Sequence, residues 1–98
     1  MTVTLGILAL LEARPGKGGE LAAFLRAGRE LAVAEEGTVT WYAFQISDTS
    51  YGIFDTFATG EGRTAHLNGQ IPAALADVSA DLLASEPDIR LVDVLAVK

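Results

Sequence analysis

The segment that decides the fold is "TVTWYAFQISDTSYGIFDTFA" (38–58), which contains two apolar runs separated by a short polar stretch. The first run, 38–47, and the second, 50–58, are rich in β-branched and aromatic residues. Such residues favour extended backbone, and the polar residues Asp48 and Thr49 suit a turn between two strands. The segment therefore predicts an antiparallel hairpin.

Two elements are predicted before this hairpin. Residues 2–13, "TVTLGILALLEA", are apolar on both faces in their middle, which is typical of a central strand. The segment "RPGKGG" (14–19) then breaks the strand. From about Lys17 to Glu35 the apolar residues recur at helical spacing, which predicts an amphipathic helix. Gly37 is the predicted C-terminal cap of that helix.

Two short helices and a strand are predicted after the hairpin. Residues 59–69 predict the first helix, with Thr59 as its N-cap, and Gly69 interrupts it. The second helix is expected to run to about Ser85. Residues 89–98, "IRLVDVLAVK", predict the last strand. The apolar stripe of the second helix consists of Ile71, Leu75, Val78 and Leu82.

The predicted order is strand, helix, strand, strand, broken helix, strand, within a single domain that spans residues 1–98. This order predicts an α+β, ferredoxin-like (βαββαβ) fold with a four-stranded antiparallel sheet. In that fold the helices cover one face of the sheet and leave the other bare. Because the first and last strands are apolar on both faces, we expect the bare face to pack against a second copy in a homodimer.

Composition excludes several classes of partner and chemistry. The net charge is −6 and the seven basic residues are scattered, so neither nucleic acid nor an anionic membrane is an expected partner. The chain has no cysteine, which excludes a disulfide, a thiolate nucleophile and a zinc–thiolate site. The first apolar run is too short to span a bilayer and lacks the flanks of a signal peptide, so a cytoplasmic protein is expected.

Almost the whole chain resembles the antibiotic biosynthesis monooxygenase (ABM) superfamily, including its quinol monooxygenase-like members. The resemblance depends on the order and spacing of five segments, which are "LEARPGKGGELAAFL" (11–25), "EEGTVTWYAF" (35–44), "YGIFDTF" (51–57), "GRTAHLNG" (62–69) and "VDVLAVK" (92–98). These segments are more specific for the fold than for the reaction, because members of the superfamily differ in substrate. The resemblance implies a dimeric α/β barrel built from two ferredoxin-like subunits.

The resemblance also implies a monooxygenase that uses O2 and needs no metal, haem or flavin cofactor. Its expected substrate is a small electron-rich aromatic molecule, a polycyclic phenol or quinol. Loss of the phenolic proton gives an anion that can pass an electron to O2, and recombination gives a hydroperoxide that collapses to a quinone. The protein must then supply a base, a polar partner for the developing charge and a dry pocket.

His66 is the only histidine of the chain and the side chain whose ordinary pKa is closest to neutral pH. The resemblance implies that His66 is the catalytic base or a hydrogen-bond partner of the substrate. The residue pattern alone also allows His66 to cap a helix end or to bond a backbone carbonyl. On a helical wheel, Thr64 and Leu67 are the expected inward residues, and His66 lies to one side of them.

Three aromatic residues are candidates for substrate binding. Trp41 and Tyr42 are adjacent on a strand, so only one of them can face the helices and stack on a flat substrate. The alternative for both is packing in the core or in a dimer interface. Phe24 is expected to form a wall of the core, and it could also line a pocket.

Two polar residues complete the predicted site. Asp55 interrupts an apolar strand, and a buried carboxylate requires a partner. That partner could be an arginine in a structural ion pair, or it could be His66, whose ring Asp55 would then orient. Asn68 could orient a substrate oxygen or could cap the end of its helix.

Two alternative functions are found in, or fit, the same fold. The haem-degrading enzymes of the same fold use an Asn on the first strand and a Trp shortly before the histidine, whereas this chain has no Asn on that strand, around Ile7, and no Trp in the ten or so residues before His66. A lone histidine with dispersed carboxylates gives no recognisable metal-ligand spacing.

A non-catalytic dimer that binds a small ligand, or has a purely structural role, fits the same fold. A sizeable closed cavity at His66 would favour the enzyme, and a filled interior would favour the structural role.

Overall fold

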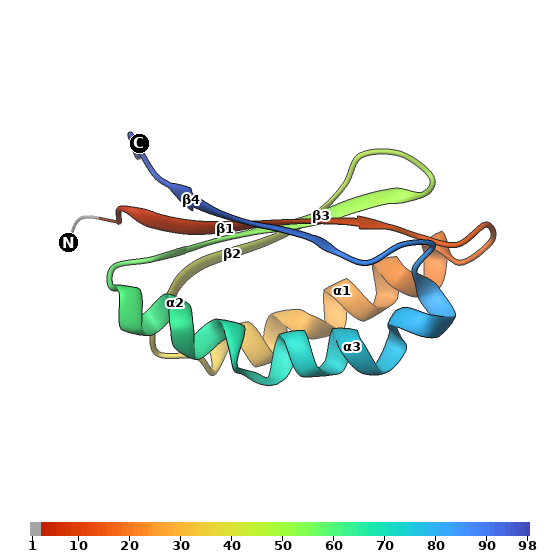
Figure 1. Ribbon diagram of the computed structural model, residues 1–98, viewed down its shortest axis with the longest axis horizontal. Coiled ribbons are helices and arrows are strands. Elements are labelled where there is room, and N and C mark those ends of the chain that lie inside the picture. The colour runs from red at the N-terminus through yellow and green to blue at the C-terminus, as the bar shows by residue number, and fades with distance from the viewer. Residues whose placement is uncertain (1–2) are drawn as a thin grey trace.

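The computed structural model describes residues 3–98, so residues 1–2, where the predicted first strand and domain begin, lie outside the described residues. The sheet has the strand order β2-β3-β1-β4, and all neighbouring strands are antiparallel. The three helices all lie on one side of this sheet (Figure 1). The α+β, ferredoxin-like fold predicted from the sequence is therefore confirmed. The elements are β1 (Leu5–Glu12), α1 (Gly18–Val33), β2 (Thr38–Gln45), β3 (Ser50–Phe57), α2 (Gly60–Leu67), α3 (Gln70–Leu82) and β4 (Asp88–Asp93).

The hydrophobic core lies between the sheet and the helices. Alternate residues of β1 and β3 point to this side, and the strand pairing sets Ala9 opposite Ile53 and Leu11 opposite Tyr51. Helix α1 covers them with residues spaced three and four apart, as an amphipathic helix must. The central cluster of the core consists of Ala9, Leu11, Ala13, Leu21, Leu25, Tyr51, Ile53, Leu75, Leu82 and Leu83.

The prediction that Gly37 caps the first helix is wrong. Helix α1 ends at Val33, the following Ala34 keeps a helical backbone, and Gly37 does not have a positive φ. Gly37 instead packs against Gly62 of α2, where an added Cβ on Gly37 would lie 2.8 Å from the Gly62 Cα. Two glycines are therefore needed for the loop after α1 to approach α2 this closely.

The two short helices are confirmed, with one correction at the end of the second. The Thr59 side chain accepts a hydrogen bond from the Gly62 N–H at 3.0 Å, so Thr59 is the N-cap of α2 as predicted. Gly69 separates α2 from α3. Helix α3 ends at Leu82 rather than near Ser85, because Leu83 turns to extended backbone and forms a bridge with Ala13.

The last strand is shorter than predicted. Strand β4 ends at Asp93, whereas the sequence predicted a strand as far as residue 98. The Val94 N–H still donates to the Thr4 carbonyl at 2.8 Å, but the paired strand β1 begins only at Leu5. The apolar alternation therefore continues past the end of the partner strand, and Leu95 is 96% exposed.

Within residues 3–98, no helix has both the length and the apolar character to cross a membrane.

The opposite face of the sheet carries no helix (Figure 1). Phe54 of β3 pairs with Leu8 of β1 on one side and with Tyr42 of β2 on the other. These three apolar side chains therefore form a continuous row on this face. A Cβ on Gly52 would overlap the Phe44 ring, which shows that this ring lies flat over the strand. We use the name bare face for the side chains of Leu8, Leu10, Tyr42, Phe44, Phe54 and Val92.

Candidate active site

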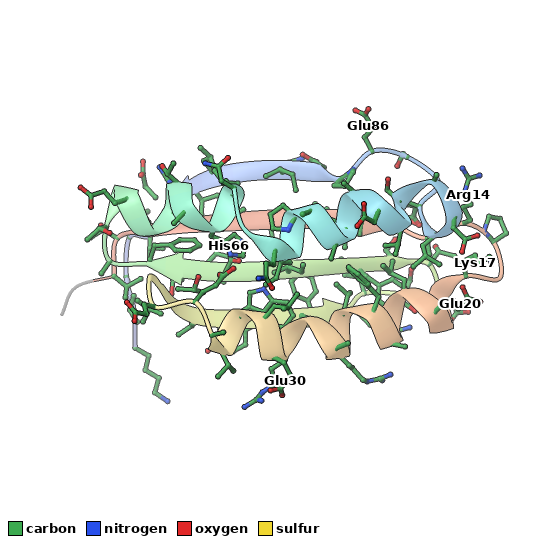
Figure 2. The ribbon with its side chains drawn as sticks, turned by 90° about the horizontal axis from the view of Figure 1, so that it is seen from below. Arg14, Lys17, Glu20, Glu30, His66 and Glu86 are labelled. Carbon is green, nitrogen blue, oxygen red and sulfur yellow. The ribbon has the colours of Figure 1, made fainter. Side chains whose placement is uncertain are left out.

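His66 lies on the inner side of helix α2 and is almost completely buried. Its side chain is 7% exposed, and its ring packs against Phe57 with a centroid distance of 5.5 Å. From the helix side, His66 lies between the row formed by α2 and α3 and the row formed by α1 (Figure 2). The expectation that Thr64 faces inward is wrong, because Thr64 is exposed, whereas Leu67 is 37% exposed but lines the cavity beside His66 and Asp55. Gly62 is four residues before His66 and so lies on the same face of α2, and its contact with Gly37 therefore turns His66 inward.

Glu35 contacts one ring nitrogen of His66. The Nδ1 atom of His66 lies 2.7 Å from Oε1 of Glu35, and the Thr38 hydroxyl donates to the same oxygen at 2.7 Å. Glu35 lies in the loop between α1 and β2, which the glycine contact brings close to α2. Glu35 is not among the residues predicted for the site. It lies at the predicted end of the first helix and is 31 residues from His66 in the sequence, so the spacing gives no signal.

Asp55 lies beside the other ring nitrogen of His66. The Nε2 atom is 3.0 Å from Oδ2 of Asp55, and Asp55 is 0% exposed in the middle of β3. This contact is not aligned as a directed hydrogen bond, and neither Asp55 oxygen accepts one from any residue in the range 3–98. The partner of Asp55 is therefore His66 and not one of the arginines considered in the sequence analysis. We call Glu35, Asp55 and His66 the carboxylate–imidazole cluster.

The cluster holds His66 in its charged form. Burial lowers the pKa of His66, but the contacts with Asp55 and Glu35 and the attraction of both carboxylates outweigh burial and raise the pKa to about 9. At neutral pH the ring is therefore an imidazolium, whose Nδ1–H donates to Glu35 and whose Nε2 forms an ion pair with Asp55. It cannot accept a further proton, but it can stabilise negative charge and hold two carboxylates in fixed positions.

His66 separates two spaces of different character. On the Asp55 side a largely apolar cavity of about 90 Å³, the more enclosed of the two spaces, lies between the sheet and helices α2 and α3, and we call it the enclosed cavity. On the Glu35 side an open groove of about 440 Å³ lies where the loop after α1 meets the α2–α3 junction. An engineered cavity of about 150 Å³ is known to hold benzene, so the enclosed cavity is too small for an aromatic ring. The groove is within the usual range of small-molecule sites, about 300–1,000 Å³.

The structure decides which of two adjacent aromatic residues faces the helices. Trp41 points to the helix side, where its ring contacts Gly28 of α1, and it pairs directly with Asp55 across β2 and β3. Its Nε1 atom is buried and has no hydrogen-bond partner among the described residues. Tyr42 belongs to the bare face and is 59% exposed. Of these two residues, only Trp41 lies near the cluster.

The other two predicted residues lie away from the cluster. Phe24 is partly buried and packs against the central core cluster, where it serves as a wall. Asn68 follows the last residue of α2, and its Nδ2 donates to the Thr64 carbonyl at 3.2 Å. The structure thus brings His66 and Asp55 together and sets Trp41 beside Asp55 on the neighbouring strand, and it places Phe24, Tyr42 and Asn68 elsewhere. In the part of the chain that the structure describes, no three His, Asp or Glu side chains are grouped to hold a metal ion.

The fold and the sequence are shared with a protein of known structure. The NE2512 protein of Nitrosomonas europaea, described as a protein of unknown function, is 47% identical to this chain with a TM-score of 0.96. The similarity covers 98% of this chain and 93% of that one. The chain therefore belongs to the same family as NE2512. No protein-family model matches the chain, and no curated protein is similar to it.

More distant structures show the same fold. PA3566 of Pseudomonas aeruginosa is 21% identical with a TM-score of 0.83, over 98% of both chains. A second protein of Nitrosomonas europaea, described as a "putative antibiotic biosynthesis monooxygenase", is 17% identical with a TM-score of 0.81. That similarity covers 94% of this chain and 90% of the other. The chain therefore has an ABM-like fold.

Proposed function

We propose that the protein is a cofactor-independent monooxygenase that oxidises an electron-rich phenol or quinol with O2. The observation that carries the proposal is the buried carboxylate–imidazole cluster, which forms the wall of both the enclosed cavity and the groove. A buried charged cluster is costly to maintain for structure alone, and perturbed groups beside a cavity are typical of functional sites. The ABM-like fold supports the same reaction class.

The proposed reaction needs one proton acceptor and one positive charge. A carboxylate takes the phenolic proton, and the resulting anion passes one electron to O2. Recombination of the two radicals forms a C–O bond, and the peroxide takes up a proton. Cleavage of the O–O bond with loss of the remaining C–H proton releases water and leaves the carbon as a carbonyl, so that one oxygen atom enters the product. The carboxylate that takes the proton becomes neutral, so the buried His66 imidazolium is then free to stabilise the anionic species, and a fixed charge acts more strongly where water is excluded.

The test is oxygen uptake with a panel of polycyclic quinols and anthrones, with metal chelators present throughout. We expect the wild-type protein to consume O2 and His66→Gln to do so at least tenfold more slowly, which corresponds to about 1.4 kcal/mol of transition-state stabilisation. His66→Ala tests the same loss where it remains folded, as judged by circular dichroism. The control is Thr64→Ala, an exposed position on the same helix, which is expected to keep the wild-type rate. Equal rates in wild type and His66→Gln would contradict a role of His66 in the chemistry.

A second candidate function is a non-catalytic module that binds a small ligand. The observation that favours it is the size of the enclosed cavity, about 90 Å³, which cannot hold an aromatic substrate next to Asp55. Next to this cavity, buried side chains form the central core cluster. Absence of O2 uptake with every quinol, together with retained ligand binding, would favour this module over the enzyme.

We also propose that two copies pack through the bare face to form a homodimer. A continuous apolar surface on a small monomer usually marks an interface, and two sheets can pack face to face at about 10 Å. Tyr42 is the most exposed of the six residues that define the bare face, and as an aromatic residue it suits the centre of an interface.

Sedimentation equilibrium tests the dimer. We expect the wild-type protein to be dimeric at micromolar concentration and Tyr42→Glu to weaken the dimer at least tenfold, because a carboxylate would be buried in the interface. The matched control is Val33→Glu, which places the same charge at a residue that is 65% exposed on the helix side. A wild-type monomer, or equal effects of the two substitutions, would contradict the proposed interface.

A further inference from the structure

We propose that the groove beside Glu35 is the binding site for a neutral, flat molecule that carries a hydroxyl group, and that Oε2 of Glu35 accepts this hydroxyl proton. The inference rests on the proposed function for the choice of a phenol as ligand. It goes further by naming the place of binding and by assigning the proton acceptor to Glu35 and not to Asp55.

The groove has the size and shape that such a ligand requires. Its volume of about 440 Å³ is about five times that of the enclosed cavity on the other side of His66. Three glycines, Gly37, Gly62 and Gly69, contribute to its lining, so parts of its surface are bare backbone. A surface without side chains allows a flat ring system to approach closely. Leu31, Ala34 and Ala65 add apolar contact area.

One oxygen of Glu35 is free to bind a ligand. Its Oε1 atom is already used by His66 and by the Thr38 hydroxyl, each at 2.7 Å. Its Oε2 atom accepts no hydrogen bond from residues 3–98, and it lies 3.2 Å from the position that a Cβ on Gly69 would occupy at the groove. The Glu35 side chain is 21% exposed, so a ligand can reach it from solvent. Asp55 is also an acceptor without a directed hydrogen bond, but it is 0% exposed beside a cavity too small for a ring.

The charges at the groove select a hydrogen-bond donor and exclude an anion. The titratable groups that line it are Glu35 and Glu36 in the loop after α1 and His66 on α2, while β2 and α3 contribute the uncharged Thr38 and Gln70. No lysine or arginine lines the groove among the described residues. The His66 imidazolium faces both carboxylates of the cluster, so it does not offer a free positive charge to an anionic ligand.

The test measures binding without turnover, so its failure can be distinguished from failure of the proposed oxidation. Under anaerobic conditions, 1-naphthol, 1-methoxynaphthalene and 1-naphthoate are titrated into isotope-labelled protein and followed by NMR. We expect 1-naphthol to shift the resonances of Gly62, Gly69 and Gln70 and to bind at least tenfold more tightly than the other two probes. Equal binding of the methoxy compound would overturn the proposal, because that compound cannot donate to Glu35. Shifts centred on Ile53 and Leu75 at the enclosed cavity, or no binding, would also overturn it.

Two pairs of variants separate the role of Glu35 from general effects on structure. Glu35→Gln removes the charge and keeps the shape, and we expect it to weaken 1-naphthol binding at least fivefold. Its control, Glu86→Gln, removes the same charge from an exposed residue at the other end of the molecule and is expected to bind normally (Figure 2). Gly69→Ala places a Cβ 3.2 Å from Oε2 of Glu35 and equally close to the Ala65 and His66 carbonyl oxygens, so it narrows the groove there and is expected to block binding, whereas Gly60→Ala adds a Cβ that meets nothing within 4 Å. If Gly69→Ala binds as well as Gly60→Ala, the groove is not the site, and this outcome decides the question even where Glu35→Gln fails to fold.

Discussion

Replacing His66 by alanine is expected to lower the free energy of unfolding by about 3–5 kcal/mol, which is the usual cost of removing one partner from a buried ion pair. The reason is the 0% exposure of Asp55, whose carboxylate has the His66 imidazolium as its partner at 3.0 Å. Without His66 this carboxylate must remain charged without a partner or take up a proton. Unfolding in urea, followed by circular dichroism, measures the loss as a lower midpoint at similar slope.

A double-mutant cycle shows whether this loss arises from Asp55. Asp55→Asn removes the charge and keeps the volume, so His66→Ala should cost about 1–3 kcal/mol less in the Asp55→Asn background than in the wild type. The matched control is Thr64→Ala on the exposed side of the same helix, which should change stability by less than about 0.5 kcal/mol. Additive effects of His66→Ala and Asp55→Asn would contradict an energetic coupling between the two residues.

The fold could be predicted from the sequence because each element carries its own local pattern. The hairpin of β2 and β3, the stripe of α1 and the cap at Thr59 all depend on residues that are neighbours in the chain. The errors lie at ends that are set by distant partners. Strand β4 stops at Asp93 because β1 begins at Leu5, and no feature of residues 94–98 themselves reports this.

The candidate site could be predicted only in part, because its geometry depends on contacts between distant segments. His66 and Asp55 were proposed as a pair from chemistry, since a buried carboxylate needs a partner, and the structure sets them 3.0 Å apart. Glu35 was missed because the loop that carries it reaches His66 only through the contact of Gly37 with Gly62. The same contact sets the rotation of α2, which explains why the helical wheel of such a short, weakly amphipathic helix did not identify His66 as its inward residue.

The stability of the protein is expected to fall as the pH rises from about 6.5 to about 9. In the unfolded chain His66 has its ordinary pKa of 6.5, whereas in the folded protein the two carboxylates raise this pKa to about 9. Below pH 6.5 both states bind the proton, so the stabilisation from the charged cluster is fully present. Between the two pKa values only the folded state holds the proton, so the free energy of unfolding falls by about 1.4 kcal/mol per pH unit, about 3 kcal/mol in all.

The single histidine makes this prediction testable at one residue, because the imidazole resonances in the NMR spectrum can come only from His66. The titration of these resonances in the folded protein should have its midpoint near pH 9. The free energy of unfolding should decline from pH 6.5, where the unfolded chain loses the proton, to about pH 9, where the folded protein loses it. His66→Gln keeps a hydrogen-bonding side chain without a titrating group, so its stability should change little between pH 6.5 and 9. A midpoint near pH 6.5 would mean that the carboxylates do not hold the proton on His66, and it would free the ring to act as the base of the reaction in place of Glu35. The pH titration therefore decides both the energetics of the buried cluster and which of its members can accept a proton from a substrate.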